Sequence, residues 1–120
     1  MEKVYIISRY RSEDPEQLAL NINVARYFCK EIVDEGKVPV APHLFYTQFL
    51  DDNEEADRIS GLKLGIWELR QADEFLLVII DGVISEGMKG EIEEVSRLGI
   101  KGRIVSMTGL EIKEAMKVIR

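Results

Sequence analysis

The sequence is poor in the residues that build disulfides and metal centres. Its 120 residues include one cysteine, Cys29, and one histidine, His43. A single cysteine excludes an internal disulfide and a cysteine-based zinc site, and a single histidine excludes a paired-histidine catalyst or a multi-histidine metal site. We therefore expect no metal and no cofactor, and we expect a cytoplasmic location.

Long apolar runs and an excess of positive charge are also missing. The longest apolar stretch, residues 75–80, has the length of a strand and falls well short of the roughly 20 residues of a membrane span. The first residues lack the layout of a signal peptide. Asp and Glu number 22 against 16 Lys and Arg, and this formal net charge of −6 argues against a general nucleic-acid-binding protein. We expect neither a membrane nor a nucleic acid as partner.

The length and the hydrophobic pattern predict a single α/β domain over residues 1–120. Short β-rich segments alternate with segments of helical period. The expected strands are 3–7, 38–40, 75–80 and 103–107, and the expected helices are 15–35, 53–71, 88–98 and 110–120. This β-α-β-α-β-α-β-α order predicts a three-layer, doubly wound parallel sheet of about four to five strands, of the flavodoxin-like or Rossmann-like kind.

Two segments carry further expectations. In the helix over 53–71, one apolar stripe is expected to face the core, and Trp67 either packs or lies in an interface; the stripe is Ile59, Leu62, Ile66 and Leu69. Residues 41–52 are expected to form a loop that is unusually aromatic for a connection.

Ligands of such sheets bind at the carboxyl ends of the strands, so the loops 8–13, 41–52 and 81–90 are the candidate site. Residues 81–90 hold three glycines and a serine before a helix, and helix N-termini favour anions. Glu91, expected in the first turn of that helix, can act as a nucleophile on an anomeric carbon or as a base; alternatively it only complements the helix dipole. Asp81, after the most apolar strand, is expected to face the open end of the sheet.

Other polar residues of these loops have both a functional and a structural interpretation. Arg11 can clamp a phosphate or carboxylate, or it is an ordinary surface arginine. His43 can serve as an acid or base, or as a structural hydrogen-bonding group. Asp52 can bind a base or a ribose hydroxyl, or cap the next helix. Tyr5 can hydrogen-bond a catalytic carboxylate, or pack in the sheet.

Taken together, three segments resemble the nucleoside 2-deoxyribosyltransferase-like superfamily, and most closely its small branch from bacterial and phage genomes. The segments are Val4 to Ser12, similar to the family's opening Tyr-x-x-Gly-Pro-Tyr; Pro39 to Phe45 with Phe49 to Asp52; and Ala72 to Glu74 through Ser85 to Ile92. Ser8 and Arg9 replace the family's Gly-Pro, and Lys89 departs from the usual Gly-x-Gly-x-Glu spacing.

The resemblance implies roles for several residues. Glu91 matches the family nucleophile, and Tyr5 matches the tyrosine that orients it. Ser85 stands where the transferases carry an aspartate; the related 2′-deoxynucleoside 5′-monophosphate N-glycosidases have a phosphate-binding serine there, and an arginine at the position of Arg11. Ionisation of Glu91, which the chemistry requires, is expected to be favoured by the helix N-terminus and by Tyr5.

The implied function is cleavage of the N-glycosidic bond, or deoxyribosyl transfer, on 2′-deoxynucleosides or their 5′-monophosphates. Further substrate or phosphate contacts are expected from Ser8, from His43, from Asp52 and from backbone N–H groups around Gly87 and Met88. Asp81 is expected to contact the sugar or to protonate the leaving base. By analogy with the family, the chain is expected to form a homodimer or a higher homo-oligomer. The alternative is a nucleotide-binding or nucleotide-sugar-binding module without turnover.

Overall fold

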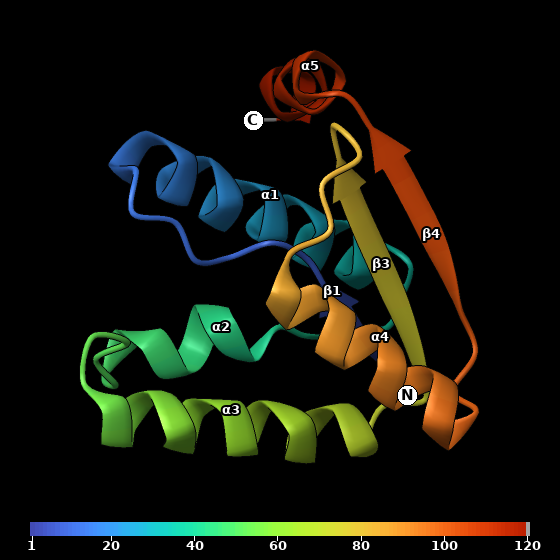
Figure 1. Ribbon diagram of the computed structural model, residues 1–120. Helices are drawn as coiled ribbons and strands as arrows, with labels where there is room; N and C mark the ends of the chain where they lie inside the picture. Colours follow the sequence, from blue (N-terminus) through green and yellow to red (C-terminus); the bar gives the residue numbers. More distant parts are fainter. Residues whose placement is uncertain (120) are drawn as a thin grey trace.

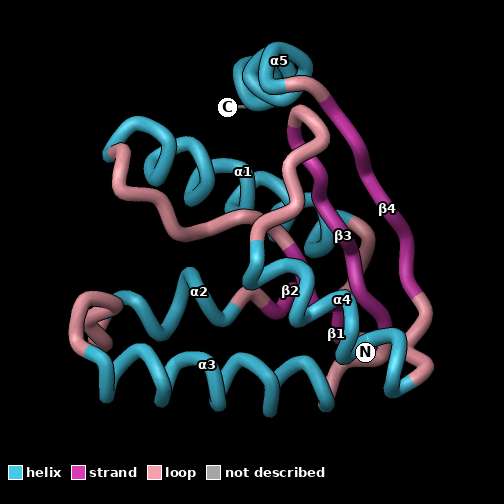
Figure 2. Tube along the Cα trace, in the orientation of Figure 1, coloured by secondary structure: helices cyan, strands magenta, loops and turns pink. Residues whose placement is uncertain are grey.

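A computed structural model describes residues 1–119, and Arg120, expected at the end of the last helix, lies outside the described residues. Within them, one parallel sheet has the strand order β2-β1-β3-β4 (Figure 1; β2 is labelled in Figure 2). The strands are β1 (Lys3–Ile7), β2 (Val38–Val40), β3 (Glu74–Ile80) and β4 (Gly102–Met107). The predicted three-layer α/β fold with a parallel sheet is confirmed.

The connecting helices are α1 (Pro15–Asp34), α2 (Pro42–Phe45), the 3₁₀ helix η1 (Tyr46–Gln48), α3 (Glu55–Arg70), α4 (Glu86–Leu98) and α5 (Gly109–Ile119). Asp14 caps α1 by accepting the N–H of Glu16 at 3.1 Å, and Pro15 occupies the first turn. Gly99 ends α4 in the left-handed conformation, with φ of 70°. The segment expected as an aromatic loop is instead largely helical, because Pro42 starts α2 and the rings that follow pack edge to face.

Helices cover both faces of the sheet (Figure 2). On one face, α1 and α5 bury a core that consists of Val4, Ile6, Val24, Phe28, Ile32, Leu76, Val78 and Ile112. On the other face, α3 and α4 bury a core that consists of Tyr5, Ile7, Leu69, Leu77, Met88 and Val95. Because successive strand residues point to opposite faces, Tyr5 lies on the side of α3 and α4.

The orientation of α3 differs from the prediction. Leu69 is buried as expected, but Ile59 and Leu62 of the expected core stripe are exposed. The side of α3 that meets the protein body carries Gly61 and Gly65: a Cβ at Gly65 would lie 3.7 Å from the Tyr5 hydroxyl, and one at Gly61 would lie 3.8 Å from Leu50. Because these glycines lack side chains, α3 approaches Tyr5 and Leu50 closely along this side. Apolar residues such as Ile59 and Leu62 lie on other sides of the helix.

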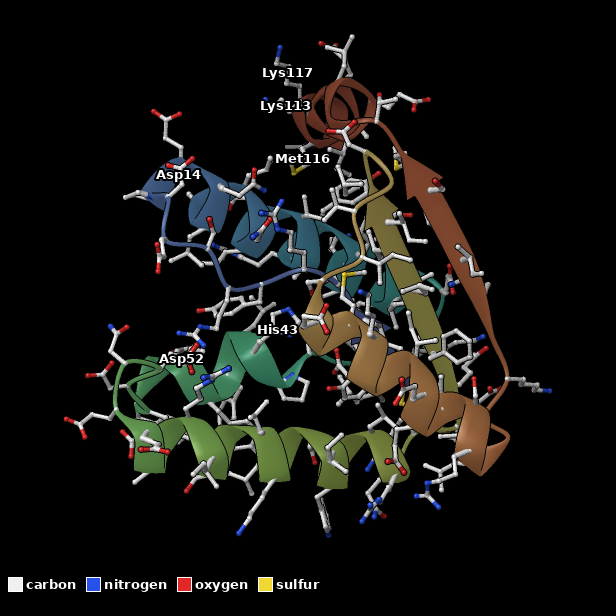
Figure 3. All side chains as sticks on the ribbon, viewed as in Figure 1. Asp14, His43, Asp52, Lys113, Met116 and Lys117 are labelled. Atoms are coloured by element: carbon white, nitrogen blue, oxygen red, sulfur yellow. The ribbon has the colours of Figure 1, made fainter. Side chains whose placement is uncertain are left out.

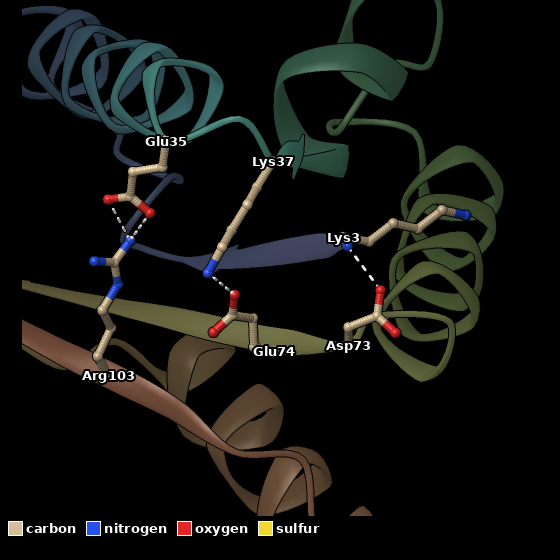
Figure 4. Close-up of polar contacts among 6 residues, drawn as sticks. All are labelled: Lys3, Glu35, Lys37, Asp73, Glu74 and Arg103. Atoms are coloured by element: carbon tan, nitrogen blue, oxygen red, sulfur yellow. Dashed lines mark hydrogen bonds and ion pairs between the residues drawn. The ribbon is translucent and has the colours of Figure 1, made fainter. Parts of the chain in front are cut away.

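Ion pairs tie the elements together at the amino end of the sheet, away from the candidate loops (Figure 4). Arg103 of β4 donates from Nη2 to both carboxylate oxygens of Glu35 at 2.5 and 2.7 Å, and Lys37 pairs with Glu74. Such exposed pairs contribute little to stability. These pairs lie at the amino end of the sheet, whereas the candidate loops lie at its carboxyl end. No helix among residues 1–119 combines the length and the apolarity that crossing a bilayer requires.

Candidate active site

A hydrogen bond between Tyr5 and Glu91 lies at the centre of the candidate site. β1 places the Tyr5 side chain under α4, where it is 2% exposed. Its hydroxyl donates to Oε2 of Glu91, across 86 residues of sequence. Glu91 is in the second turn of α4, one turn later than expected, because the helix begins at Glu86. The structure thus joins two residues that the sequence singled out separately.

The environment of this pair changes the proton affinity of both groups. Burial raises the pKa of the Glu91 carboxyl to about 7 from its ordinary value of 4.5, and the hydrogen bond from Tyr5 only partly opposes that rise. Burial, followed by the charge and hydrogen bond of Glu91, raises the pKa of Tyr5 far above its ordinary range. Tyr5 therefore remains a proton donor. Contrary to expectation, burial outweighs the tyrosine, and Glu91 is only partly ionised near neutral pH.

The segment before Glu91 forms a capped helix N-terminus. The hydroxyl oxygen of Ser85 accepts the N–H of Met88 at 3.2 Å, and the Ser85 N–H donates to the sulfur of Met88 at 3.4 Å. Met88 is buried and holds this turn against the sheet, while Gly87 is exposed. The backbone N–H of Met88 is therefore already bonded to the Ser85 hydroxyl oxygen. The exposed part of the α4 N-terminus is at Gly87.

A second contact group joins the β1–α1 loop to α2. Ser8 is buried, and its hydroxyl lies 3.4 Å from Nε2 of His43; the ring of His43 also packs against Tyr10 at 5.1 Å between centroids. Burial lowers the pKa of His43 to about 4, so the imidazole is neutral at neutral pH. This makes His43 a poor proton donor there and favours a hydrogen-bonding role.

Arg11 and Asp52 line one open groove of about 900 Å³, together with Arg9, Tyr10, Ser12, Glu13, Asp14, Leu18 and Asn53. The groove lies between the β1–α1 loop and the α2–α3 connection, and Figure 3 shows Asp14 and Asp52 on its two sides and His43 nearer the sheet. A second hollow, of about 20 Å³, borders α1 and has room for little more than a water molecule. Tyr5 and Glu91, both described, line neither of these hollows.

Asp81 has a different partner from the one expected. Its backbone is left-handed, with φ of 54°, and Oδ1 accepts the N–H of Gly109 at 2.8 Å. A Cβ at Gly109 would lie 2.9 Å from the other carboxylate oxygen, so a side chain there would have to displace the Asp81 carboxylate. Asp81 therefore caps α5 on the far side of the sheet from α4. Its carboxylate is therefore engaged with α5, away from the Tyr5–Glu91 pair.

Sequence reasoning missed the contribution of α3 to this site. Gly65 lies against the Tyr5 hydroxyl, and the charge of Glu68 adds to the rise in the pKa of Tyr5. The signal available was the spacing of Gly61 and Gly65, four residues apart on one helix side, which indicates close approach to another element. Among residues 1–119, no group of three or more His, Cys, Asp or Glu side chains is arranged to hold a metal ion.

Comparisons with known proteins agree with the fold. A family model described as "Domain of unknown function (DUF7768)" matches residues 2–105. No curated protein matches the chain. A similar solved structure is a 2-deoxyribosyltransferase from the psychrotolerant bacterium Bacillus psychrosaccharolyticus, described as a biocatalyst for the synthesis of antiviral and antitumoral nucleosides. The TM-score is 0.70 at 22% identity, over 89% of this chain and 74% of that one, which shows a shared fold.

Proposed function

Since the chain belongs to the DUF7768 family and shares the fold of a 2-deoxyribosyltransferase, we propose that it acts on the N-glycosidic bond of 2′-deoxynucleosides or their 5′-monophosphates, with Glu91 as nucleophile. The observation that carries the proposal is the hydrogen bond from buried Tyr5 to Glu91. A carboxylate that only complemented a helix dipole would be solvated. This one is desolvated and held by a tyrosine, as a positioned nucleophile needs to be.

In the proposed reaction, a carboxylate oxygen of Glu91 forms a bond to C1′ of the sugar while the bond from C1′ to the base nitrogen breaks. The bonding electrons leave with the base, which takes a proton from water. The resulting glycosyl ester is opened by water, which gives the free sugar, or by the nitrogen of a second base, which gives a new nucleoside. Tyr5 holds the carboxylate through its O–H group and is a positioning residue.

We assign a 5′-phosphate to the N-terminal face of α4. The Ser85 oxygen accepts from Met88, so its own hydroxyl proton can still be donated to a phosphate oxygen. Backbone N–H groups around exposed Gly87 and the helix dipole favour an anion there. The exposed guanidinium of Arg11 supplies positive charge from the β1–α1 loop.

The remaining predicted substrate contacts come from the groove and its floor. Ser8 and neutral His43 offer a hydroxyl and an imidazole beside the carboxyl end of β1. Asp52, in the wall opposite Arg11, can accept hydrogen bonds from a base. We propose these three residues as contacts to the nucleoside.

The test is release of free base. Each 2′-deoxynucleoside and each 5′-monophosphate is incubated with the protein at about pH 8, where most Glu91 is ionised given its raised pKa, and free base is measured by chromatography. Glu91→Gln should abolish release, while Glu93→Gln, an exposed neighbour on α4, should retain it. Adding a second base and looking for a new nucleoside distinguishes transfer from hydrolysis. No release from any substrate, or equal release by Glu91→Gln, contradicts the proposal.

The second candidate function is nucleotide binding without turnover. The observation that favours it is the raised pKa of Glu91, since a carboxyl that is partly protonated at neutral pH is a weaker nucleophile. This function predicts a rise in melting temperature with a nucleotide or a nucleotide-sugar and no change in that ligand. A melting-temperature rise accompanied by base release favours the first function.

A further inference from the structure

Arg9 is a partly buried cation without a counter-ion. It lies two residues after the end of β1, and none of the ion pairs among residues 1–119 involves its guanidinium. Three other described arginines also lack an ion pair, but all three are exposed; they are Arg11, Arg26 and Arg58. A charged group that loses hydration and gains no partner costs free energy. Arg9 therefore indicates a place for an anion.

The position of Arg9 connects the two hollows at the carboxyl end of the sheet. Arg9 lines the groove of about 900 Å³ together with Arg11. It also lines the hollow of about 20 Å³, whose wall includes Val83 of the β3–α4 loop, two residues before Ser85. Among the described residues that line these hollows, Arg9 alone lines both. Arg9 therefore lies between the proposed 5′-phosphate site at the start of α4 and the open groove.

The groove wall changes sign along the β1–α1 loop. Arg9 and Arg11 come first after β1, and Glu13 and Asp14 follow them along the same groove. Within the described residues, neither carboxylate forms an ion pair with either arginine. Asp14 instead caps α1 by accepting the N–H of Glu16. The part of the groove nearest β1 is thus positive and favours an anion, whereas the part nearest α1 is negative and repels one.

We propose that Arg9 binds a second phosphate and that the preferred substrates are 2′-deoxynucleoside 5′-diphosphates. The inference rests on the proposed function, which assigns the first phosphate to Ser85 and the N-terminus of α4. The second phosphate then lies at the positive part of the groove, where the planar guanidinium of Arg9 donates to its oxygens and Arg11 adds charge. A third phosphate would approach Glu13 and be repelled, so the triphosphate gains nothing over the diphosphate.

The experiment measures binding separately from turnover. Glu91→Gln removes the proposed nucleophile, and calorimetric titration of this variant gives dissociation constants for the 5′-mono-, di- and triphosphate of each 2′-deoxynucleoside. The diphosphate of the preferred base should bind about 30-fold more tightly than its monophosphate, because the second phosphate adds charge-assisted hydrogen bonds to Arg9. The triphosphate should bind no more tightly than the diphosphate. The same series with the wild-type chain, followed by release of free base, measures turnover.

Substitutions of Arg9, each combined with Glu91→Gln, test its role. Arg9→Gln should weaken binding of the diphosphate about 20-fold and binding of the monophosphate less than about threefold. Arg9→Lys keeps the charge but loses the planar fork, so it should recover part of the preference. Arg26→Gln removes an exposed arginine of α1 that lines neither hollow; it is the matched control and should leave both affinities unchanged. Circular dichroism and thermal melting confirm that each variant is folded.

Equal affinity for mono- and diphosphates, or binding of neither, overturns the inference, as does a preference that Arg9→Gln retains. An equal loss for both ligands in Arg9→Gln assigns Arg9 to the first phosphate and also overturns it. Base release from monophosphates without a preference for diphosphates contradicts the second phosphate site and leaves the proposed function intact. A preference that depends on Arg9, without base release from any substrate, contradicts the proposed catalysis and leaves the second phosphate site intact.

Discussion

Replacement of Glu91 by glutamine should stabilise the protein at alkaline pH. The carboxyl is partly buried, and its pKa is about 7 in the folded chain against an ordinary value of 4.5. The folded state therefore binds the proton more tightly than the unfolded state. This group contributes stability that is fully present below about pH 4.5 and is lost as the pH rises through about 7.

The magnitude follows from the pKa difference. Each pKa unit corresponds to about 1.4 kcal/mol, so the full shift is worth about 3 kcal/mol. Between about pH 5 and pH 8, the wild type should lose about 2 to 3 kcal/mol relative to Glu91→Gln. Glutamine keeps the shape of the side chain and can still accept the hydrogen bond from Tyr5. The packing and hydrogen-bond contributions to the free energy of unfolding therefore cancel between wild type and Glu91→Gln. The difference in melting temperature should reach about 10 °C.

The assay is urea unfolding followed by far-UV circular dichroism at several pH values, with the protein concentration held constant because association also adds stability. Glu93→Gln serves as the control, and its pH dependence should run parallel to that of the wild type. A stability difference between wild type and Glu91→Gln that stays flat with pH, or that grows in favour of the wild type, refutes the reasoning. If Glu91→Gln is more stable than the wild type but no longer releases base, then the Glu91 carboxylate serves the reaction at a cost in stability.

Three further predictions concern the neighbours of Glu91 and the loops. Tyr5→Phe removes the hydrogen bond that lowers the pKa of Glu91, so the midpoint of the pH–rate profile for base release should move above 7 and the rate should fall about 10-fold to 100-fold. Ser85→Ala should cost about 1 kcal/mol in urea unfolding through the lost cap, and raise KM for monophosphates more than for nucleosides. His43 has a lowered folded pKa, so the wild type should lose about 3 kcal/mol relative to His43→Gln as the pH falls from about 6.5 through 4, measured by acid unfolding.

Much of the fold could be predicted from the sequence because it depends on local patterns. Alternation of β-rich and helical segments determines the parallel α/β arrangement, since parallel strands need crossover helices. The apolar run over 75–80 indicated the inner strand β3, and the helix start expected at residue 15 and the helix end expected at residue 98 are those of α1 and α4. The start of α4 was missed by two residues because Ser85 caps the helix earlier than the apolar spacing indicates.

The orientation of α3 and the setting of Asp81 could not be predicted. Apolar residues lie on several sides of α3, so periodicity does not distinguish the side that packs from the side that is exposed; the glycine side packs because it allows close approach. Asp81 follows an apolar strand, as a site residue would, but its left-handed backbone directs it to the N-terminus of α5. Both outcomes depend on the shape of neighbouring elements.

Some features of the candidate site could likewise be predicted from the sequence, and others depend on the tertiary structure. The sequence by itself determined which residue types stand on the strands and in the loops that follow them: a tyrosine within the first strand, and a serine, glycines and Glu91 after the third. Only the tertiary structure decided that Tyr5 and Glu91, 86 residues apart, share a hydrogen bond, and that burial raises the pKa of Glu91 to about 7. Residue identity and helix capping are local properties, whereas desolvation depends on what every packed element excludes from the same space.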